Sequence, residues 1–128
     1  MIAIGSDHGG FELKGHIIEH LKEKGIEVKD FGTYSEASVD YPDCAKPVCK
    51  AVLDGECECG ILICGTGIGI SMAANKFKGI RAALCGDVFS AKMSKEHNNA
   101  NVICMGGRVL GRELANMIVD TYLEAEFQ

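Results

Sequence analysis

A cysteine stands directly before a glycine-rich turn near the middle of the chain, in the run CGTGIG over residues 64–69. Glycines allow backbone N–H groups to converge on an anion, and a helix that begins after the turn adds positive potential. A thiol at a helix N-terminus can have its pKa lowered from about 8.5 into the neutral range, and it could then act as a base. Buried cysteines are mostly inert core residues, and Cys85 and Cys104 also end apolar runs. Adjacency to the turn is what distinguishes Cys64.

Three interpretations of this turn compete. A P-loop requires a Gly-Lys-Ser/Thr sequence, and the turn contains no lysine. A dinucleotide fingerprint requires a third glycine where Ile70 stands, although Asp87 lies at the distance expected of a ribose-binding acid. The third interpretation is an anion hole for a small substrate, and the pattern alone has modest specificity.

Other titratable groups follow the apolar runs or end the amphipathic segments. Asp7 and His8 stand on a glycine-rich turn after the first run, where they could contact substrate or, equally well, be a helix cap and an exposed imidazole. His97 ends an amphipathic segment and is either an acid/base near neutral pH or a C-capping residue. Arg108 follows the last apolar run, where it could grip a phosphate in forked geometry or lie exposed at a turn.

Short apolar runs that alternate with amphipathic segments must position these groups. The pattern predicts strands over Ile2–Ser6 and residues 26–31, 60–64, 80–85 and 102–105. It predicts helices over residues 10–24, 42–53, 87–97 and 110–124, and a further helix from the glycine turn to residue 75. We therefore predict a single α/β domain over residues 1–128, a three-layer αβα sandwich with a Rossmann-like five-stranded parallel sheet. Ligands of such sheets bind at the carboxyl ends of the strands.

The composition argues against several classes of protein. The chain has 128 residues, of which 47% are hydrophobic, enough for one domain with a core. Its net charge of −5 leaves no basic footprint for nucleic acid. The first residues lack the pattern of a signal peptide, and no apolar run approaches the length of a membrane span. Seven cysteines at irregular spacings predict free thiols in a reducing cytoplasm, without a zinc site.

Seven short motifs stand in a fixed order along the chain. They are Asp7-His8-Gly9-Gly10-Phe11, Asp40-Tyr41-Pro42, Cys64-Gly65-Thr66-Gly67-Ile68-Gly69, Ala74-Asn75-Lys76, Gly79-Ile80-Arg81-Ala82, His97-Asn98 and Asn101-Val102. In order and spacing the set resembles the ribose-5-phosphate isomerase B family, which includes the galactose-6-phosphate isomerase subunits. The resemblance covers essentially the whole chain and implies the same sandwich fold. It also implies the interconversion of an aldose phosphate and a ketose phosphate without a metal or any other cofactor.

The resemblance implies roles for individual residues. Cys64 is expected to take the C2 proton and His97 to open the sugar ring, and Thr66 and Asp7 complete the expected catalytic set. The expected substrate contacts are Asp7, His8, Tyr41, Gly65, Thr66, Gly67, Ile68, Gly69, Asn98 and Arg108. Among these, the glycine turn is expected at the enediolate, and His8 and Arg108 at the phosphate. A homodimer, or a tetramer built from it, is implied, in which the partner subunit donates the His97-Asn98 segment.

Family members usually continue past the last helix with a segment that carries further phosphate-binding arginines, whereas this sequence stops at Gln128 without them. We expect the chain to be a shortened version of a longer protein. As it stands, it would hold phosphate through His8, Arg108 and helix dipoles, and its KM would be raised.

Alternatives remain for the substrate and for the class of protein. A six-carbon phosphate, such as galactose 6-phosphate or allose 6-phosphate, competes with ribose 5-phosphate. A non-catalytic nucleotide-binding module that uses the glycine turn and Asp87 is a third hypothesis. It leaves Cys64 and His97 without a role.

Overall fold

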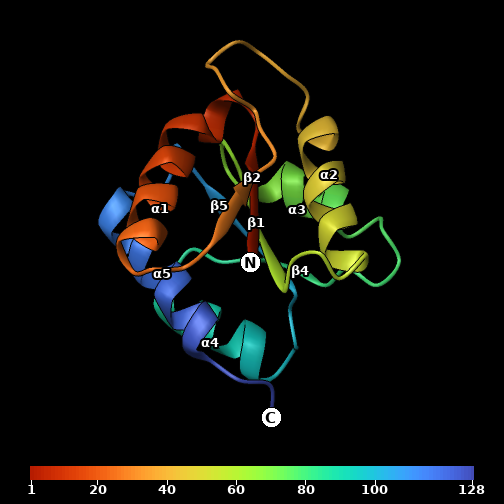
Figure 1. Ribbon diagram of the computed structural model, residues 1–128, viewed down its shortest axis with the longest axis vertical. Coiled ribbons are helices and arrows are strands. Elements are labelled where there is room, and N and C mark those ends of the chain that lie inside the picture. Colours follow the sequence, from red (N-terminus) through yellow and green to blue (C-terminus); the bar gives the residue numbers. More distant parts are fainter.

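Five parallel strands form the central sheet of the computed structural model, which describes all of residues 1–128 (Figure 1). They are β1 (Ile2–Ser6), β2 (Val28–Asp30), β3 (Cys59–Cys64), β4 (Ala82–Leu84) and β5 (Val102–Gly106). Their order across the sheet is β2-β1-β3-β5-β4, and every neighbouring pair is parallel. This arrangement confirms the predicted sheet.

Helices cover both faces of the sheet, as Figure 1 shows. They are the 3-10 turn η1 (His8–Gly10), and α1 (Phe11–Glu23), α2 (Tyr41–Leu53), α3 (Ile68–Ala74), α4 (Val88–Glu96) and α5 (Arg112–Glu124). Buried side chains of α1, α4 and α5 share one apolar cluster with one face of the sheet. Those of α2 and α3 share a second cluster with the other face. The fold is therefore the three-layer αβα sandwich that the sequence predicts.

The strand β3 shows how the sequence determines this layering. All six of its residues are buried. Ile61 and Ile63 belong to the cluster that contains α1, while Leu62 and Cys64 belong to the cluster that contains α2. Successive side chains of a strand point to opposite faces, so a run that is apolar throughout must be covered on both.

The two edge strands are shorter than the sequence predicts. β2 spans residues 28–30 rather than 26–31, and β4 spans residues 82–84 rather than 80–85. Each has a neighbouring strand on one side only, so fewer ladder hydrogen bonds hold its ends. The helix predicted to start at Pro42 starts at Tyr41, and the proline then occupies an early position where its missing N–H costs nothing.

The chain leaves the sheet in opposite directions after β1 and β3, which are neighbours. β1 leads into α1 on one face, and β3 leads into α3 on the other. Such a switch point opens a crevice outside the carboxyl ends of the two strands, and this is where ligands bind in open α/β sheets. No helix combines the length and the apolar composition that crossing a membrane requires.

Candidate active site

Three glycine-containing loops meet at the carboxyl ends of β1, β3 and β5. A Cβ on Gly9 would lie 3.0 Å from the Gly65 nitrogen, and a Cβ on Gly107 would lie 2.5 Å from the Gly9 carbonyl oxygen. The Gly107 N–H donates to the carbonyl oxygen of Cys64 at 2.8 Å, and the Arg108 N–H donates to that of Gly65 at 3.0 Å. Because side chains would prevent this approach, the glycines allow the loops to form one compact backbone cradle.

Cys64 ends β3 at this cradle and is only 5% exposed. Its Sγ accepts a hydrogen bond from the Gly67 N–H at 3.1 Å. Gly67 has a φ of 83°, in the left-handed region, and α3 begins at the next residue. An N–H donor and a helix N-terminus are groups that stabilise a thiolate. The structure thus brings together the thiol and the turn as the sequence predicts.

Other thiols of the chain lie in the apolar clusters. Burial raises the pKa of the Cys49 and Cys59 thiols to about 11, and it raises the pKa of Cys104 well above the usual range. Burial also raises the pKa of Cys85, whose thiol lies beside Ser94. Cys85 and Cys104 are therefore buried core residues, in agreement with one of the two interpretations of the sequence.

Thr66 and Tyr41 border the turn. The Thr66 Oγ1 accepts a hydrogen bond from the Ile68 N–H at 3.2 Å, which leaves its own hydroxyl hydrogen free to donate. The Tyr41 ring packs so closely on Gly69 that a Cβ there would lie 2.9 Å from the tyrosine Cζ. The aromatic side chain and the hydroxyl therefore belong to the surroundings of the turn.

Asp7 and His8 follow β1 on the other side of the crevice. Asp7 is 7% exposed, and its Oδ1 accepts a hydrogen bond from the Gly9 N–H at 2.8 Å, so it caps η1 as one interpretation of the sequence predicts. The Nδ1 of His8 accepts a hydrogen bond from the Val39 N–H at 3.2 Å. The opposite ring nitrogen, Nε2, has no partner in the chain and is free to bind a ligand.

Arg108 brings a positive charge to the same edge of the sheet. Its Nη1 lies 3.4 Å from the position that a Cβ of Gly65 would occupy, so the guanidinium lies over the first glycine of the turn. A guanidinium binds phosphate oxygens in a forked geometry, and backbone N–H groups add further donors. The edge therefore combines a thiol, N–H donors, an imidazole and a guanidinium, a set suited to binding an anionic substrate and moving a proton.

His97 and Asn98 do not reach this edge within one chain. His97 caps the C-terminus of α4, as its alternative interpretation predicts, and both residues are exposed. They precede β5, whose first residue Val102 pairs with Gly60 at the amino end of β3. Gly60 is four residues, or about 13 Å of strand, from Cys64. One chain alone therefore supplies only part of the predicted site.

Comparison with known proteins identifies the family. The sequence profile described as Ribose/Galactose Isomerase matches residues 2–128. The chain belongs to the ribose/galactose isomerase family. It is 55% identical to ribose-5-phosphate isomerase B of Escherichia coli over 127 residues, which are 99% of this chain and 85% of that protein. It is 48% identical to the galactose-6-phosphate isomerase subunit LacB of Clostridium acetobutylicum over 128 residues, 100% of this chain and 74% of the subunit.

Solved structures agree with this assignment. The structure of ribose-5-phosphate isomerase B from Clostridium thermocellum matches with a TM-score of 0.98 and 59% sequence identity. The match covers 99% of this chain and 86% of that one. The family resemblance and the fold predicted from the sequence are both confirmed.

In this member of the ribose/galactose isomerase family, the segment that carries His97 and Asn98 is held by contacts that the sequence does not reveal. Asn99 has a φ of 50°, in the left-handed region that non-glycine residues rarely adopt. The Arg81 Nε donates to the Asn99 carbonyl oxygen at 2.7 Å, and the buried Tyr122 hydroxyl donates to that of Ala100 at 2.6 Å. Spacing along the chain carries no signal of these long-range partners, which fix the segment.

Asp87, the acid of the nucleotide hypothesis, caps α4. Its Oδ1 accepts a hydrogen bond from the Ser90 N–H at 2.7 Å, and its Oδ2 accepts one from the Ser90 hydroxyl at 2.8 Å. These hydrogen bonds lower the pKa of the Asp87 carboxyl. The fold already uses this carboxylate, so the nucleotide hypothesis loses one of its two supporting features.

Proposed function

We propose that this chain interconverts ribose 5-phosphate and ribulose 5-phosphate through a cis-enediolate, with Cys64 as the base. The observation that carries the proposal is the position of the Cys64 thiol, 3.1 Å from the Gly67 N–H at the start of a donor-lined turn. The similarity to a relative named ribose-5-phosphate isomerase B supports the choice of substrate.

The reaction moves one proton between adjacent carbons. The Cys64 thiolate takes the proton from C2 of the open-chain aldose phosphate, and the C–H electrons move toward the C1 carbonyl to form an enediolate. A proton passes from O2 to O1, and the thiol returns its proton to C1 as the C2 carbonyl forms. One base serves both carbons, because a cis-enediolate exposes C1 and C2 on one face. No electrons leave the substrate, so the step needs no redox cofactor.

The backbone cradle can stabilise the negative charge that develops on the enediolate oxygens. Backbone N–H groups of the turn other than those of Gly67 and Ile68, together with the free Thr66 hydroxyl hydrogen, can donate to the enediolate oxygens. One preorganised donor of this kind is typically worth about 3–4 kcal/mol in the transition state. His8 Nε2 and Arg108 would hold the phosphate, while Asp7 and Tyr41 would contact the sugar.

A six-carbon sugar phosphate is the alternative substrate, and the similarity to a galactose-6-phosphate isomerase subunit favours it. Initial rates on ribose 5-phosphate, galactose 6-phosphate and allose 6-phosphate under one set of conditions decide between the two. We expect the highest kcat/KM on ribose 5-phosphate. A higher kcat/KM on either hexose phosphate would contradict the proposed substrate and leave the chemistry in place.

The second part of the proposal is a homodimer with shared active sites, either as the whole assembly or as half of a tetramer. The positions of His97 and Asn98 support it. His97 and Asn98 lie at the amino edge of the sheet and would act on a substrate bound at the Cys64 turn of a partner subunit. Large apolar side chains are exposed around that turn, namely Ile68, Leu84 and Val109. Clustered apolar exposure of this kind marks interaction surfaces, and a second copy of the chain would cover it.

Mixing two inactive variants tests the shared site. Cys64→Ala and His97→Ala subunits, unfolded and refolded together, would form heterodimers in which one site keeps both Cys64 and His97. Random pairing makes half of the dimers mixed, so about a quarter of the wild-type activity should return. Separate refolding of each variant is the control. A mixture no more active than its components would contradict a site shared between subunits.

We assign the enzyme to the cytoplasm. All seven cysteines are free. Free thiols persist in a reducing compartment, which supports this assignment.

A further inference from the structure

The loop between β2 and α2 contacts the candidate active site at its far end. Residues 31–40 contain no helix or strand. The Val39 N–H donates to the Nδ1 of His8, and Tyr41, directly after the loop, packs on Gly69 of the turn. The position of this loop therefore affects two residues expected to contact substrate.

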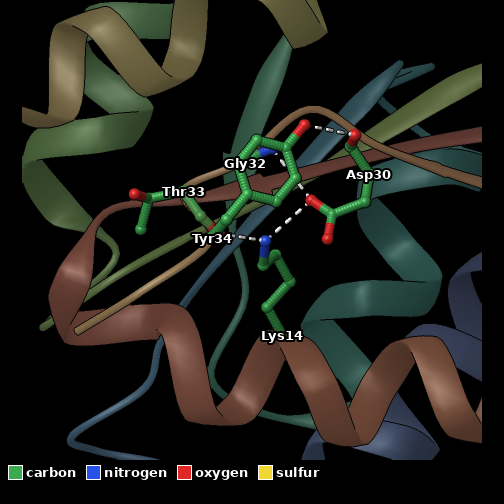
Figure 2. A network of polar contacts seen from close by, with 5 residues as sticks. All are labelled: Lys14, Asp30, Gly32, Thr33 and Tyr34. Atoms are coloured by element: carbon green, nitrogen blue, oxygen red, sulfur yellow. Dashed lines mark hydrogen bonds and ion pairs between the residues drawn. The ribbon is translucent and has the colours of Figure 1, made fainter.

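A buried lysine holds the near end of the loop. Lys14 of α1 is 1% exposed, and its Nζ lies 2.7 Å from the Asp30 Oδ1 and donates to the Thr33 carbonyl oxygen (Figure 2). The same Asp30 oxygen accepts the Gly32 N–H at 2.8 Å. The Tyr34 hydroxyl donates to the Asp30 carbonyl oxygen at 3.0 Å, and its ring centroid lies 5.2 Å from the lysine Nζ. Figure 2 shows these groups gathered around the single ammonium group.

The held segment pairs with the last residue of β1. The Ser6 N–H donates to the Gly32 carbonyl oxygen at 2.7 Å, and the Thr33 N–H donates to the Ser6 carbonyl oxygen at 2.7 Å. Asp7 and His8 follow Ser6 directly. Lys14 therefore fixes the start of the loop relative to Asp7 and His8, and His8 is the residue that Val39 contacts near the end of the loop.

The Val39 contact determines which nitrogen of His8 carries the proton. A backbone N–H can only donate, so the Nδ1 that accepts it must be unprotonated. In the neutral ring the proton then sits on Nε2, the nitrogen without a partner in the chain. His8 is thereby prepared as a hydrogen-bond donor, the form that a phosphate or hydroxyl oxygen requires.

We propose that Lys14 is a positioning residue: it anchors residues 31–34 so that Val39 reaches His8 and holds its imidazole with the proton on Nε2. The consequence for substrate binding rests on the function proposed above. The tautomer itself does not depend on that function, because it is a property of the free protein. Lys14 touches no substrate and acts only through the loop.

The test replaces Lys14 by methionine, which keeps the length of the side chain and removes the ammonium. Histidine-selective 15N labelling of the full chain reports the tautomer of His8, read from spectra in which the ring is neutral. His8→Asn assigns the signal. We expect the wild type to show the Nε2–H form alone and Lys14→Met to show both tautomers. KM for ribose 5-phosphate should rise about tenfold, the effect of one hydrogen bond, with kcat little changed.

Lys29→Met is the matched control, since Lys29 is an exposed lysine paired with Glu56 at 2.6 Å. It should leave both the tautomer and KM unchanged. A Lys14→Met protein that melts at a lower temperature but keeps the Nε2–H form would overturn the proposal and make Lys14 a structural residue only. If that variant does not fold, Val39→Pro removes the donor directly, and retention of the single tautomer there would overturn the proposal as well. If the wild type is inactive on every sugar phosphate while the His8 tautomer behaves as expected in all variants, the proposed function is refuted. The proposal about Lys14 and the tautomer would then still stand.

Discussion

Replacing Gly67 by alanine tests the link between the backbone of the turn and the chemistry at Cys64. At a φ of 83°, a residue with a side chain costs about 1–2 kcal/mol. The new Cβ would lie 2.5 Å from the Leu84 Cδ1 and 2.8 Å from the Met105 carbonyl carbon. The exposed leucine can move, but Met105 belongs to the buried strand β5 and cannot, so overpacking adds about 1–3 kcal/mol. The free energy of unfolding should fall by about 2–5 kcal/mol.

The same change should also slow the reaction. Shifting the backbone moves the Gly67 N–H from its position 3.1 Å from the Cys64 Sγ and disturbs the donors that follow it. Loss of one such donor lowers kcat by about a hundredfold to a thousandfold. Urea unfolding measures the first effect, and initial rates of ribulose 5-phosphate formation, taken well below the melting temperature, measure the second.

Gly15→Ala is the matched control. Gly15 lies in the interior of α1, has no positive φ, and would place a Cβ with no atom within 4 Å. Alanine there should raise the free energy of unfolding by about 0.5–1 kcal/mol and leave kcat unchanged. A Gly67→Ala protein with wild-type stability and wild-type kcat would refute the account of the turn.

Three further predictions concern stability. Burial raises the pKa of Cys49 and Cys59 from 9.0 to about 11, so the unfolded chain loses these protons at a lower pH than the folded chain does. The free energy of unfolding should therefore fall as the pH rises from about 9 to about 11, by about 2 kcal/mol per thiol. Urea midpoints that stay constant over this pH range would contradict this prediction. Asp87→Ala removes the cap of α4, so it should lower the melting temperature slightly while leaving kcat and KM intact, and a large loss of activity would revive a ligand-binding role for this acid. Tyr122→Phe leaves the Ala100 carbonyl oxygen without its partner, which should lower the free energy of unfolding by about 1–3 kcal/mol in urea titrations; an unchanged value would mean that water replaces the hydroxyl.

The sequence predicts the core better than the edges of the sheet. Strand β3 is apolar at every position except Gly60, and this pattern requires a strand covered on both faces. The ends of β2 and β4 depend on how many hydrogen bonds a neighbouring strand supplies, and this number follows from the strand order rather than from local residue types. The sequence therefore predicts the existence of every strand, but it predicts the two edge strands, β2 and β4, to be longer than they are.

The candidate site divides in the same way. Cys64 and its turn are contiguous in sequence, so their proximity is predictable. The contact of Val39 with His8 spans 31 residues and uses a backbone N–H, for which no residue type is a signal. Arg81 directly precedes β4, and Asn99 follows the end of α4. The two residues are in contact only because the fold places these two points at the same edge of the sheet. Such long-range contacts require the fold before they can be predicted.

Hydrogen exchange at C2 of the substrate tests whether Cys64 is the base that removes the C2 proton. Ribose 5-phosphate incubated with the enzyme in deuterated water reports proton removal by NMR, and calorimetry reports binding of the same ligand. Cys85→Ala, at another strand-end thiol, is the control and should exchange C2 hydrogen as the wild type does. We predict that Cys64→Ala binds ribose 5-phosphate but exchanges no hydrogen at C2. Exchange near the wild-type rate in Cys64→Ala would show that another group is the base.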